Sequence, residues 1–501
     1  MLRNIALLLL LLAVNTIDTY VVFAQSPVST FTAPSVACLQ ETLPIKNNSS
    51  SPALYEWDFC ADDFQTLKTN FDLASLTGLV NGFGYKLVED NGLWFAFVVS
   101  QTGARIFRID LGDSPLNFPL QVADLGNPGN ALSFPQDIEI YKANGVWYGF
   151  VGFNDPNYGI VKLDFGSTIT NNSPTAINIG NFGVSGRFWD LKIVTQGTDL
   201  ILLISERNSG SLIRVNFRDS FNNTISNSTH VFVTSPITIN LSPGFDILQV
   251  NGNWIGLVTS YFDNKIYQVG FGADILSAPV LLTSFSLPTF NHPMRIRAIQ
   301  EGNRYVGIVS NESSQISIVD LKDLTLLNPP SLISHVGLPS LLGISVIRAN
   351  GKSVVMGVGT VDNKAKRLIF ESDCGASQSF LQVATPNINY ALGGTKVIEL
   401  RVTDVASKKM ASSSNVVSIS SLTAPDISFS ISGACVNNGV NFTSQNISGG
   451  IAAYAWDFGD ALTSTQISPS HSYMSVGAYT TNLQVTAANG CTNIAESDII
   501  I

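Results

Sequence analysis

The chain has 501 residues, which is too long for one ordinary hydrophobic core, so two or three domains are expected. Hydrophobic residues make up 45% of the chain and charged residues only 13%, a balance typical of folded rather than disordered proteins. The net charge of −10 is spread thinly and there is no Lys/Arg run, so neither nucleic acid nor an anionic membrane surface is indicated as a partner.

Residues 1–24 are typical of a signal peptide. Arg3 supplies a positive start, residues 5–14 form a short apolar stretch, and Ala24 ends a small-residue cleavage site. A membrane anchor is the alternative, but polar residues such as Asp18 interrupt the apolar run well short of the ~20 residues that a span needs. We therefore expect a secreted or cell-surface protein, no membrane insertion after signal removal, and a compartment in which disulfides persist.

A motif of two strands around a tight turn recurs along the chain. Each copy has a hydrophobic strand, an Asn-Gly-like turn and a second strand, which together indicate a β-hairpin. The turn glycines are Gly92, Gly145, Gly197, Gly252, Gly302 and Gly351. Two further short strands follow in each copy, and four strands at a period of about 50 residues are typical of a β-propeller blade.

The sixth copy lacks its fourth strand, because the repeat stops at residues 367–371. A segment before the first copy, residues 69–74, resembles fourth strands such as residues 121–126. A strand from the beginning of the repeat region that completes the last blade closes the ring and removes its open edges. The sequence thus predicts a six-bladed β-propeller over residues 61–373.

The C-terminal region contains the most specific motif of the chain. Residues 454–460 read Tyr-Ala-Trp-Asp-Phe-Gly-Asp, and residues 469–473 and 482–486 continue the pattern. This run resembles the PKD (polycystic-kidney-disease-type) family, which implies an immunoglobulin-like β-sandwich over residues 423–501. The resemblance also implies a spacer or interaction module without chemistry of its own, as in exported bacterial proteins of adhesion or gliding motility systems.

The same motif occurs earlier in two pieces. Residues 55–60 match its first half, and residues 386–403 align without gaps on residues 469–486, which places Tyr390 on Tyr473. We therefore predict an all-β chain. In it the propeller is inserted into a loop of a first PKD-like sandwich, built from residues 25–60 and 374–422, and a second PKD sandwich follows.

The cysteines fit this arrangement. Cys60 and Cys374 flank the insert and are predicted to form a disulfide at its neck. The resemblance to PKD domains of bacterial surface proteins implies a second bridge between Cys435 and Cys491. Cys38 aligns with Cys435 but finds no counterpart of Cys491 in its own sandwich, so it is expected to be the odd thiol.

Signals of catalysis are sparse. The chain has four histidines without metal-ligand spacing, and it lacks the HExxH, GxSxG, P-loop and EF-hand patterns. We therefore expect no catalytic residues, no enzyme activity and no cofactor, apart from a cation at the propeller channel. The identity of any metal is left open.

One constellation predicts a ligand-binding channel mouth. Asp137, Asp190 and Asp246 are assigned to the same repeat position, at the start of the strand that lines the channel, and Arg295 takes that position in the fifth repeat. Trp189 precedes one of them. Such groups suit a cation, a polar ligand or acid–base work. The structural alternative is that the carboxylates bond backbone N–H groups of the neighbouring loop.

These features predict an extracellular or cell-surface binding or adhesion protein. The propeller would display a face to an extracellular protein or glycan, and the sandwiches would act as spacers. The alternative is a propeller-based hydrolase or lyase that acts on extracellular polysaccharide with the Asp/Arg ring as its site.

Overall fold

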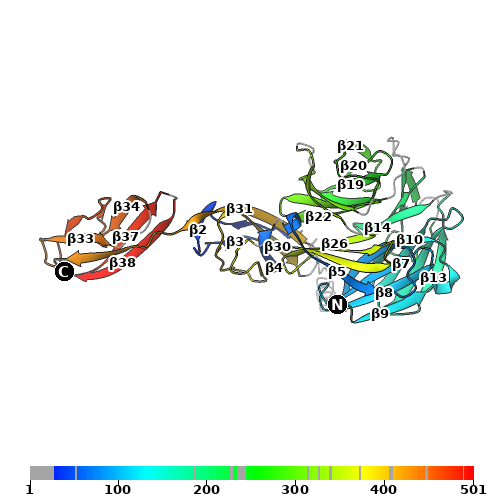
Figure 1. Cartoon of the computed structure of the whole chain (residues 1–501), viewed down its shortest axis with the longest axis horizontal. Helices are drawn as coiled ribbons and strands as arrows, with labels where there is room; N and C mark the ends of the chain where they lie inside the picture. Colours follow the sequence, from blue (N-terminus) through cyan, green and yellow to red (C-terminus); the bar gives the residue numbers. More distant parts are fainter. Residues whose placement is uncertain are drawn as a thin grey trace, which may run out of the picture.

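The computed structural model describes residues 27–501 except 51–52, 62, 184–186, 209, 226–229, 234–243, 313–314, 325–327, 338–340, 372–373, 406–409, 446–449 and 489. The predicted signal peptide lies outside the described residues. The regular secondary structure of the described residues is β-strand, apart from the short 3-10 helices η1 (Asp63–Gln65) and η2 (Pro128–Asn130). A propeller, a first sandwich and a second sandwich lie in a row, so the molecule is elongated (Figure 1).

The propeller consists of six four-stranded antiparallel blades, as the repeat predicts. Blade 1 is β6 (Gly82–Asp90), β7 (Leu93–Ser100), β8 (Arg105–Gly112) and β9 (Gln121–Gly126); blade 2 is β10 (Pro135–Ala143), β11 (Val146–Phe153), β12 (Ile160–Gly166) and β13 (Thr175–Gly180); blade 3 is β14 (Phe188–Gln196), β15 (Asp199–Glu206), β16 (Ser211–Asn216) and β17 (His230–Val233). Blade 4 is β18 (Phe245–Val250), β19 (Asn253–Ser260), β20 (Lys265–Gly272) and β21 (Val280–Phe285); blade 5 is β22 (Pro293–Glu301), β23 (Arg304–Asn311), β24 (Gln315–Lys322) and β25 (Ser331–Gly337); blade 6 is β26 (Leu341–Ala349), β27 (Lys352–Gly359), β28 (Lys364–Phe370) and β5 (Leu67–Ser75).

The ring closes through β5, which precedes blade 1 in the sequence and forms the outer strand of blade 6. Residues 67–75 pair antiparallel with β28, from Lys364 opposite Ser75 to Phe370 opposite Leu67. Apolar side chains then pack between blades, and the cluster between blades 6 and 1 joins Leu73 and Val354 to Phe107. The chain therefore enters and leaves the propeller side by side, as a loop insertion requires.

The first sandwich is assembled from both sides of the propeller. One sheet has the order β2 (Val36–Leu39), β31 (Met410–Thr423), β30 (Gly394–Asp404), β4 (Ala53–Ala61) and β29 (Phe380–Leu381), and β1 (Phe31–Thr32) pairs with β3 (Lys46–Asn47). Trp57 and Tyr390 lie in the same buried core. The Tyr390 hydroxyl donates a hydrogen bond to the Phe59 carbonyl at 2.7 Å, which ties the two halves of the split motif together.

The second sandwich repeats this design without an insertion. Its sheets are β32 (Ser428–Ser432), β33 (Gly439–Gln445) and β36 (Ser470–Ser472), and β35 (Thr463–Ser464), β34 (Ile451–Asp457), β37 (Ala478–Ala487) and β38 (Thr492–Ile500). Trp456 is buried, and the Tyr473 hydroxyl donates to the Phe458 carbonyl at 3.0 Å. This bond is the counterpart of the bond from Tyr390 to Phe59, so the two sandwiches share one core pattern.

Two disulfides are present, and one of them differs from the expectation. Cys60 and Cys374 are bonded at the neck of the insert, as predicted. The bridge predicted between Cys435 and Cys491 is wrong, because Cys491 is bonded to Cys38 of the first sandwich, and Cys435 is the exposed free thiol.

The physical reason for the Cys38–Cys491 pairing lies in β2, which runs parallel to the end of β31 and carries Cys38 to the junction with the second sandwich. There Asn493 of β38 donates to the Pro425 carbonyl at 2.7 Å, so the β37–β38 hairpin lies at the same junction. In the part of the chain that the structure describes, we find no helix with the length and apolar character that a membrane span requires.

Candidate functional site

The innermost strands of the blades surround a central channel, and their pairing registers decide which side chains share a level. Asp137 and Asp190 each directly follow a β-bulge, and each lies opposite the same position in the second strand of its blade. We call this shared position a level of the channel. In blade 4 the residue at this level is Gly244, as the hydrogen bond from the Thr259 N–H to its carbonyl shows. Asp246 lies two residues further along, so the prediction that it shares the position of Asp137 and Asp190 is wrong.

Each of the three aspartates binds the backbone of the next blade. Asp137 accepts the Leu191 N–H at 2.9 Å, Asp190 accepts the Phe245 N–H at 2.9 Å, and Asp246 accepts the Ala298 N–H at 2.8 Å. All three are at most 2% exposed. Carboxylates held in this way connect neighbouring blades, which is the structural alternative weighed above.

Arg295 lies between the carboxylates of this level. Its Nη1 is 2.6 Å from Asp190 Oδ1, and its Nη2 is 3.6 Å from Asp137 Oδ1. Arg297 adds a second guanidinium 2.7 Å from Asp190. Burial raises the pKa of Asp137 to about 7. Burial also acts on Asp190, but Arg295 and Arg297 outweigh it and hold the pKa of that carboxyl at about 2.

Arg295 and Arg297 thus supply positive charge at the place where a bound cation was expected. Among the described residues, no group of three His, Cys, Asp or Glu side chains is arranged as metal ligands. The next level of the channel is also paired. Lys86 is 2.7 Å from Glu139, and Lys192 is 2.6 Å from Asp246. These pairs line a cavity of about 130 Å³.

An apolar layer covers the buried ring at the end where the innermost strands begin. The β-bulges of four blades each leave one residue out of the pairing register, and these residues are Gln136, Trp189, Met294 and Leu342. A bulge re-aims its side chain, and Trp189, Met294 and Leu342 form one buried cluster, with Phe83 and Tyr261 packed against it. Trp189 therefore separates the buried ring from the face above.

That face, which we call the open end, carries the turns between the second and third strands of each blade. In each blade, the residue directly after the second strand lies at this end. These residues are Gln101, Asn154, Arg207, Tyr261, Glu312 and Thr360. Trp189 is the bulge residue near the start of β14 in blade 3, and His292 comes from the loop that leads into blade 5. We define the mouth cluster as Trp189, Arg207, Tyr261, His292 and Glu312.

The mouth cluster is held by stacking and hydrogen bonds. The Arg207 guanidinium lies 4.2 Å from the centre of the Trp189 ring. The rings of Tyr261 and His292 stack at 4.4 Å, and the Tyr261 hydroxyl donates to Glu312. His292 Nδ1 is 3.7 Å from the Glu312 carboxylate. Burial, followed by the hydrogen bond to Glu312, raises the pKa of Tyr261 to about 12, so the phenol stays protonated at neutral pH.

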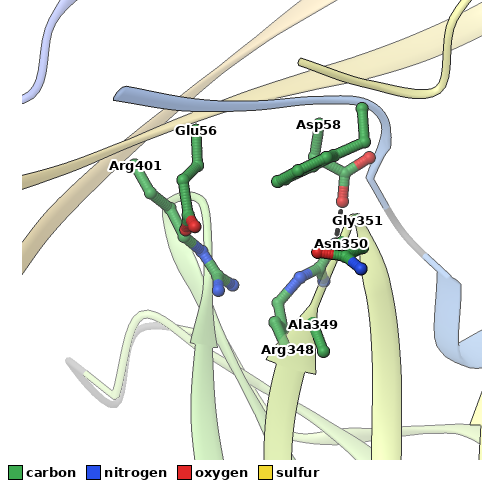
Figure 2. Close-up of a pocket in the computed structure, with 8 residues that line it drawn as sticks. Glu56, Asp58, Arg348, Ala349, Asn350, Gly351 and Arg401 are labelled. Carbon is green, nitrogen blue, oxygen red and sulfur yellow. Dashed lines mark hydrogen bonds and ion pairs between the residues drawn. The ribbon is translucent and has the colours of Figure 1, made fainter. Parts of the chain in front are cut away.

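The first sandwich contacts the opposite end of the propeller, where the innermost strands turn into the second ones. Glu399 of β30 accepts the Gly302 N–H of the blade 5 turn at 3.0 Å. A small pocket lies beside this contact, between β4 and the blade 6 turn, and Figure 2 shows Arg348 pointing from blade 6 toward Asp58 of β4. A strand of nine residues is about 30 Å long, so the sandwich leaves the open end uncovered.

Arg348 is the centre of the buried charges at this joint. It bonds Asp58, lies 2.6 Å from Glu301 and 3.9 Å from Glu399. Burial raises the pKa of Asp58 to about 6. For Glu399 burial is outweighed by Arg401 and Arg348, which lower its pKa. The joint couples the blades to the sandwich through charges that are all withdrawn from water.

Arg207, Tyr261, His292 and Glu312 were not predicted as a group from the sequence. A signal was present, since Arg207, Tyr261 and Glu312 hold one repeat position directly after the second strand. It was weak because the residue type changes from blade to blade. Of the residues that were selected, Trp189 lies at the open end, whereas Asp137, Asp190, Asp246 and Arg295 lie beneath it in the buried ring.

Comparison with known proteins identifies the C-terminal unit. The PKD domain family matches residues 423–501. Residues 423–501 are a PKD domain. This domain is similar to the crystallised PKD1 domain of Vibrio anguillarum Epp, with 32% identity over 16% of this chain and 94% of that one and a TM-score of 0.15. A microbial collagenase of Vibrio alginolyticus is 41% identical over 69 residues, which is 13% of this chain and 8% of the collagenase.

The propeller is similar to solved propeller structures. An endo-arabinase from Bacteroides thetaiotaomicron is 12% identical over 60% of this chain and 96% of its own, with a TM-score of 0.33, and further similar structures are also glycoside hydrolases. The prediction that the chain is not an enzyme is therefore corrected. At these identities the likeness shows the fold alone, so catalysis has to be argued from the residues of this chain.

Proposed function

We propose that the protein binds an extracellular polysaccharide at the mouth cluster and cleaves it there. The observation that carries the proposal is the grouping of aromatic rings with acid–base side chains on the end of the propeller that the sandwich leaves uncovered. Next to the cluster, Phe262 is 64% exposed and meets the Tyr261 ring edge-on at 5.1 Å. Exposed aromatic faces beside hydrogen-bonding groups suit the apolar faces and hydroxyls of sugars.

The chemistry proposed for cleavage uses the titratable groups of the cluster. Glu312 and His292 have side chains that are 54% and 39% exposed, so a substrate can reach them. Tyr261 keeps its proton at neutral pH, and its hydroxyl donates a hydrogen bond to Glu312, which orients the carboxylate. We assign Glu312 as the general base that takes a proton from the attacking water and His292 as the general acid that protonates the leaving glycosidic oxygen, while Tyr261 orients Glu312. Water is then added across the bond, as hydrolysis requires.

The two sandwiches would hold this end away from the cell surface. In Figure 1 the second sandwich, the first sandwich and the propeller follow one another along the long axis. The joint with the first sandwich uses the opposite end of the blades, through Gly302 and Arg348. Such an arrangement supports a stalk that presents the open end to a polymer.

The test is to incubate the exported chain with a panel of soluble polysaccharides and to measure binding by calorimetry and turnover by new reducing ends. We expect binding and turnover on at least one polymer. The Glu312→Gln variant should bind it but lose activity on the order of 100-fold or more, while Glu496→Gln on the second sandwich should behave as wild type. Binding without turnover would support a display or adhesion role and contradict cleavage. The absence of both binding and turnover would contradict the whole proposal.

A further inference from the structure

Arg207 is unusual among the arginines of this protein. In the part of the chain that the structure describes, its guanidinium makes no ion pair and no hydrogen bond, and its Nε is buried without a partner. The other arginines that are buried or half-buried each hold a carboxylate or a carbonyl, apart from Arg187: Arg108, Arg214, Arg295, Arg297, Arg304, Arg348, Arg367 and Arg401.

Arg187 is the neighbour of Arg207. Its backbone N–H donates to the Glu206 carboxylate at 3.1 Å, while its guanidinium makes no ion pair among the described residues. The Arg207 N–H donates to the Arg187 carbonyl at 3.0 Å, so the two residues lie on adjacent backbone segments at the open end. Burial, and after it the positive charge of Arg187, lower the pKa of Arg207. The Glu312 carboxylate acts to raise the pKa of Arg207, but no ion pair joins it to either arginine among the described residues. Two neighbouring cations without an ion-paired carboxylate form a site of positive potential in a protein whose net charge is −10.

The surroundings of Arg207 fix how it presents its charge. Its guanidinium is stacked on Trp189, which is only 6% exposed and is packed against Met294 and Leu342. The Trp189 Nε1–H donates to Asn154 at 3.4 Å, which holds the ring that supports the guanidinium. A planar cation positioned in this way can donate paired hydrogen bonds to an oxyanion.

Glu312 lies near enough for its charge to act on Arg207, but the two side chains do not form an ion pair. Its carboxylate accepts the Tyr261 hydroxyl and faces His292, and no contact with Arg207 is within ion-pair distance. The cluster thus has an acid–base pair and a separate cation. That division suits a sugar whose negative group is bound at Arg207 while its glycosidic bond lies near Glu312.

We propose that the mouth cluster recognises an anionic polysaccharide and that Arg207, assisted by Arg187, binds the negatively charged group of one sugar. This inference rests on the proposed function and names its substrate class. A uronate carboxylate and a sulfate ester present the same chemistry to a guanidinium, namely two oxygens in one plane.

The experiment compares matched polymers by calorimetry on the whole exported chain. One pair is polygalacturonate and its carboxyl-reduced neutral form, and the other is dextran sulfate and dextran. We expect at least one charged polymer to bind 10-fold or more tightly than its neutral partner, with affinity that falls as NaCl is raised. The pair that shows the difference distinguishes carboxylate from sulfate.

Variants assign the effect to Arg207. Arg207→Gln should remove the preference for the charged polymer, and Arg207→Lys should keep part of it. Arg218→Gln, an exposed arginine of the same blade at the opposite end, should leave it unchanged. A circular dichroism melt confirms that each variant is folded.

The outcomes separate this inference from the proposed function. If a neutral polymer is bound or cleaved as well as its charged partner, the anion site is wrong while the proposed function stands. If Arg207→Gln is folded and keeps the preference, Arg207 is not the site. If no polymer of either kind binds, both proposals are wrong.

Discussion

Arg295 of blade 5 donates a hydrogen bond from Nη2 to the carbonyl of Gln136 on blade 2, at 3.0 Å. In a ring of six blades these two are diametrically opposed, so a single side chain crosses the channel. On its way it lies between Asp137 and Asp190. The centre of the propeller is therefore a closed network of charges, and the exposed chemistry of the open end lies above it.

Asp190 should be essential for stability rather than for ligand binding. It is fully buried, accepts the Phe245 N–H and balances Arg295 and Arg297. Replacing it by Asn leaves two buried guanidinium groups undercompensated, so Asp190→Asn should lower the free energy of unfolding by about 3–5 kcal/mol. Urea unfolding measures this loss.

The control for Asp190 is Asp124→Asn. Asp124 forms an ion pair with Arg105 in which both side chains are more than a third exposed. Such a pair contributes at most about 1 kcal/mol. A loss at Asp190 no larger than that at Asp124 would contradict the buried-network interpretation.

Asp137 predicts a pH dependence with a definite sign. Its pKa in the folded chain is raised from 3.8 to about 7 by burial, so its contribution to stability is complete below pH 3.8 and is lost as the pH rises through about 7. Wild type should therefore lose stability between pH 5 and pH 8, and Asp137→Asn should lose less, by on the order of 1–3 kcal/mol.

Chemical unfolding at the two pH values checks this expectation. Asp113→Asn, at an exposed turn, serves as the control and should follow wild type. Equal pH dependence in wild type and Asp137→Asn would show that Asp137 titrates at an ordinary pH. Asp190 acts in the opposite direction, since its lowered pKa of about 2 means that its contribution is lost only in strong acid.

Arg348 should hold the propeller to the first sandwich. Its replacement by Met leaves Asp58, Glu301 and Glu399 buried together, and the expected loss is about 3–5 kcal/mol. Lys352→Met is a matched control on the same blade, because the Lys352–Glu371 pair is partly exposed and contributes at most about 1 kcal/mol. Differential scanning calorimetry distinguishes the two, and similar melting temperatures would contradict the role of Arg348.

The disulfide between the two sandwiches predicts a specific labelling pattern. Under non-reducing conditions an alkylating reagent should modify Cys435 alone, because Cys435 is exposed and the other four cysteines are bonded. Peptide mapping should find the segment with Cys38 linked to the segment with Cys491. A peptide in which Cys435 is linked to Cys491 would refute the pairing.

The sequence alone determined the architecture of this chain. Turn glycines such as Gly92 recur at one period because each blade needs the same hairpin, and its φ of 82° is the left-handed conformation that such a turn uses. The motif around Trp57 resumes at Tyr390 because both residues fill one core. Local periodicity and a repeated core pattern are written in the order of residues, so they can be found without coordinates.

Only the tertiary structure decided which residues meet. Asp246 lies opposite Leu257, two residues further along its strand than the level of Asp190, although both follow the start of their strands. Cys491 finds Cys38 rather than Cys435 because a parallel strand carries Cys38 across a domain boundary. Contacts of this kind join segments that are remote in sequence, and closure of the ring brings Arg207 and Glu312 to one face for the same reason.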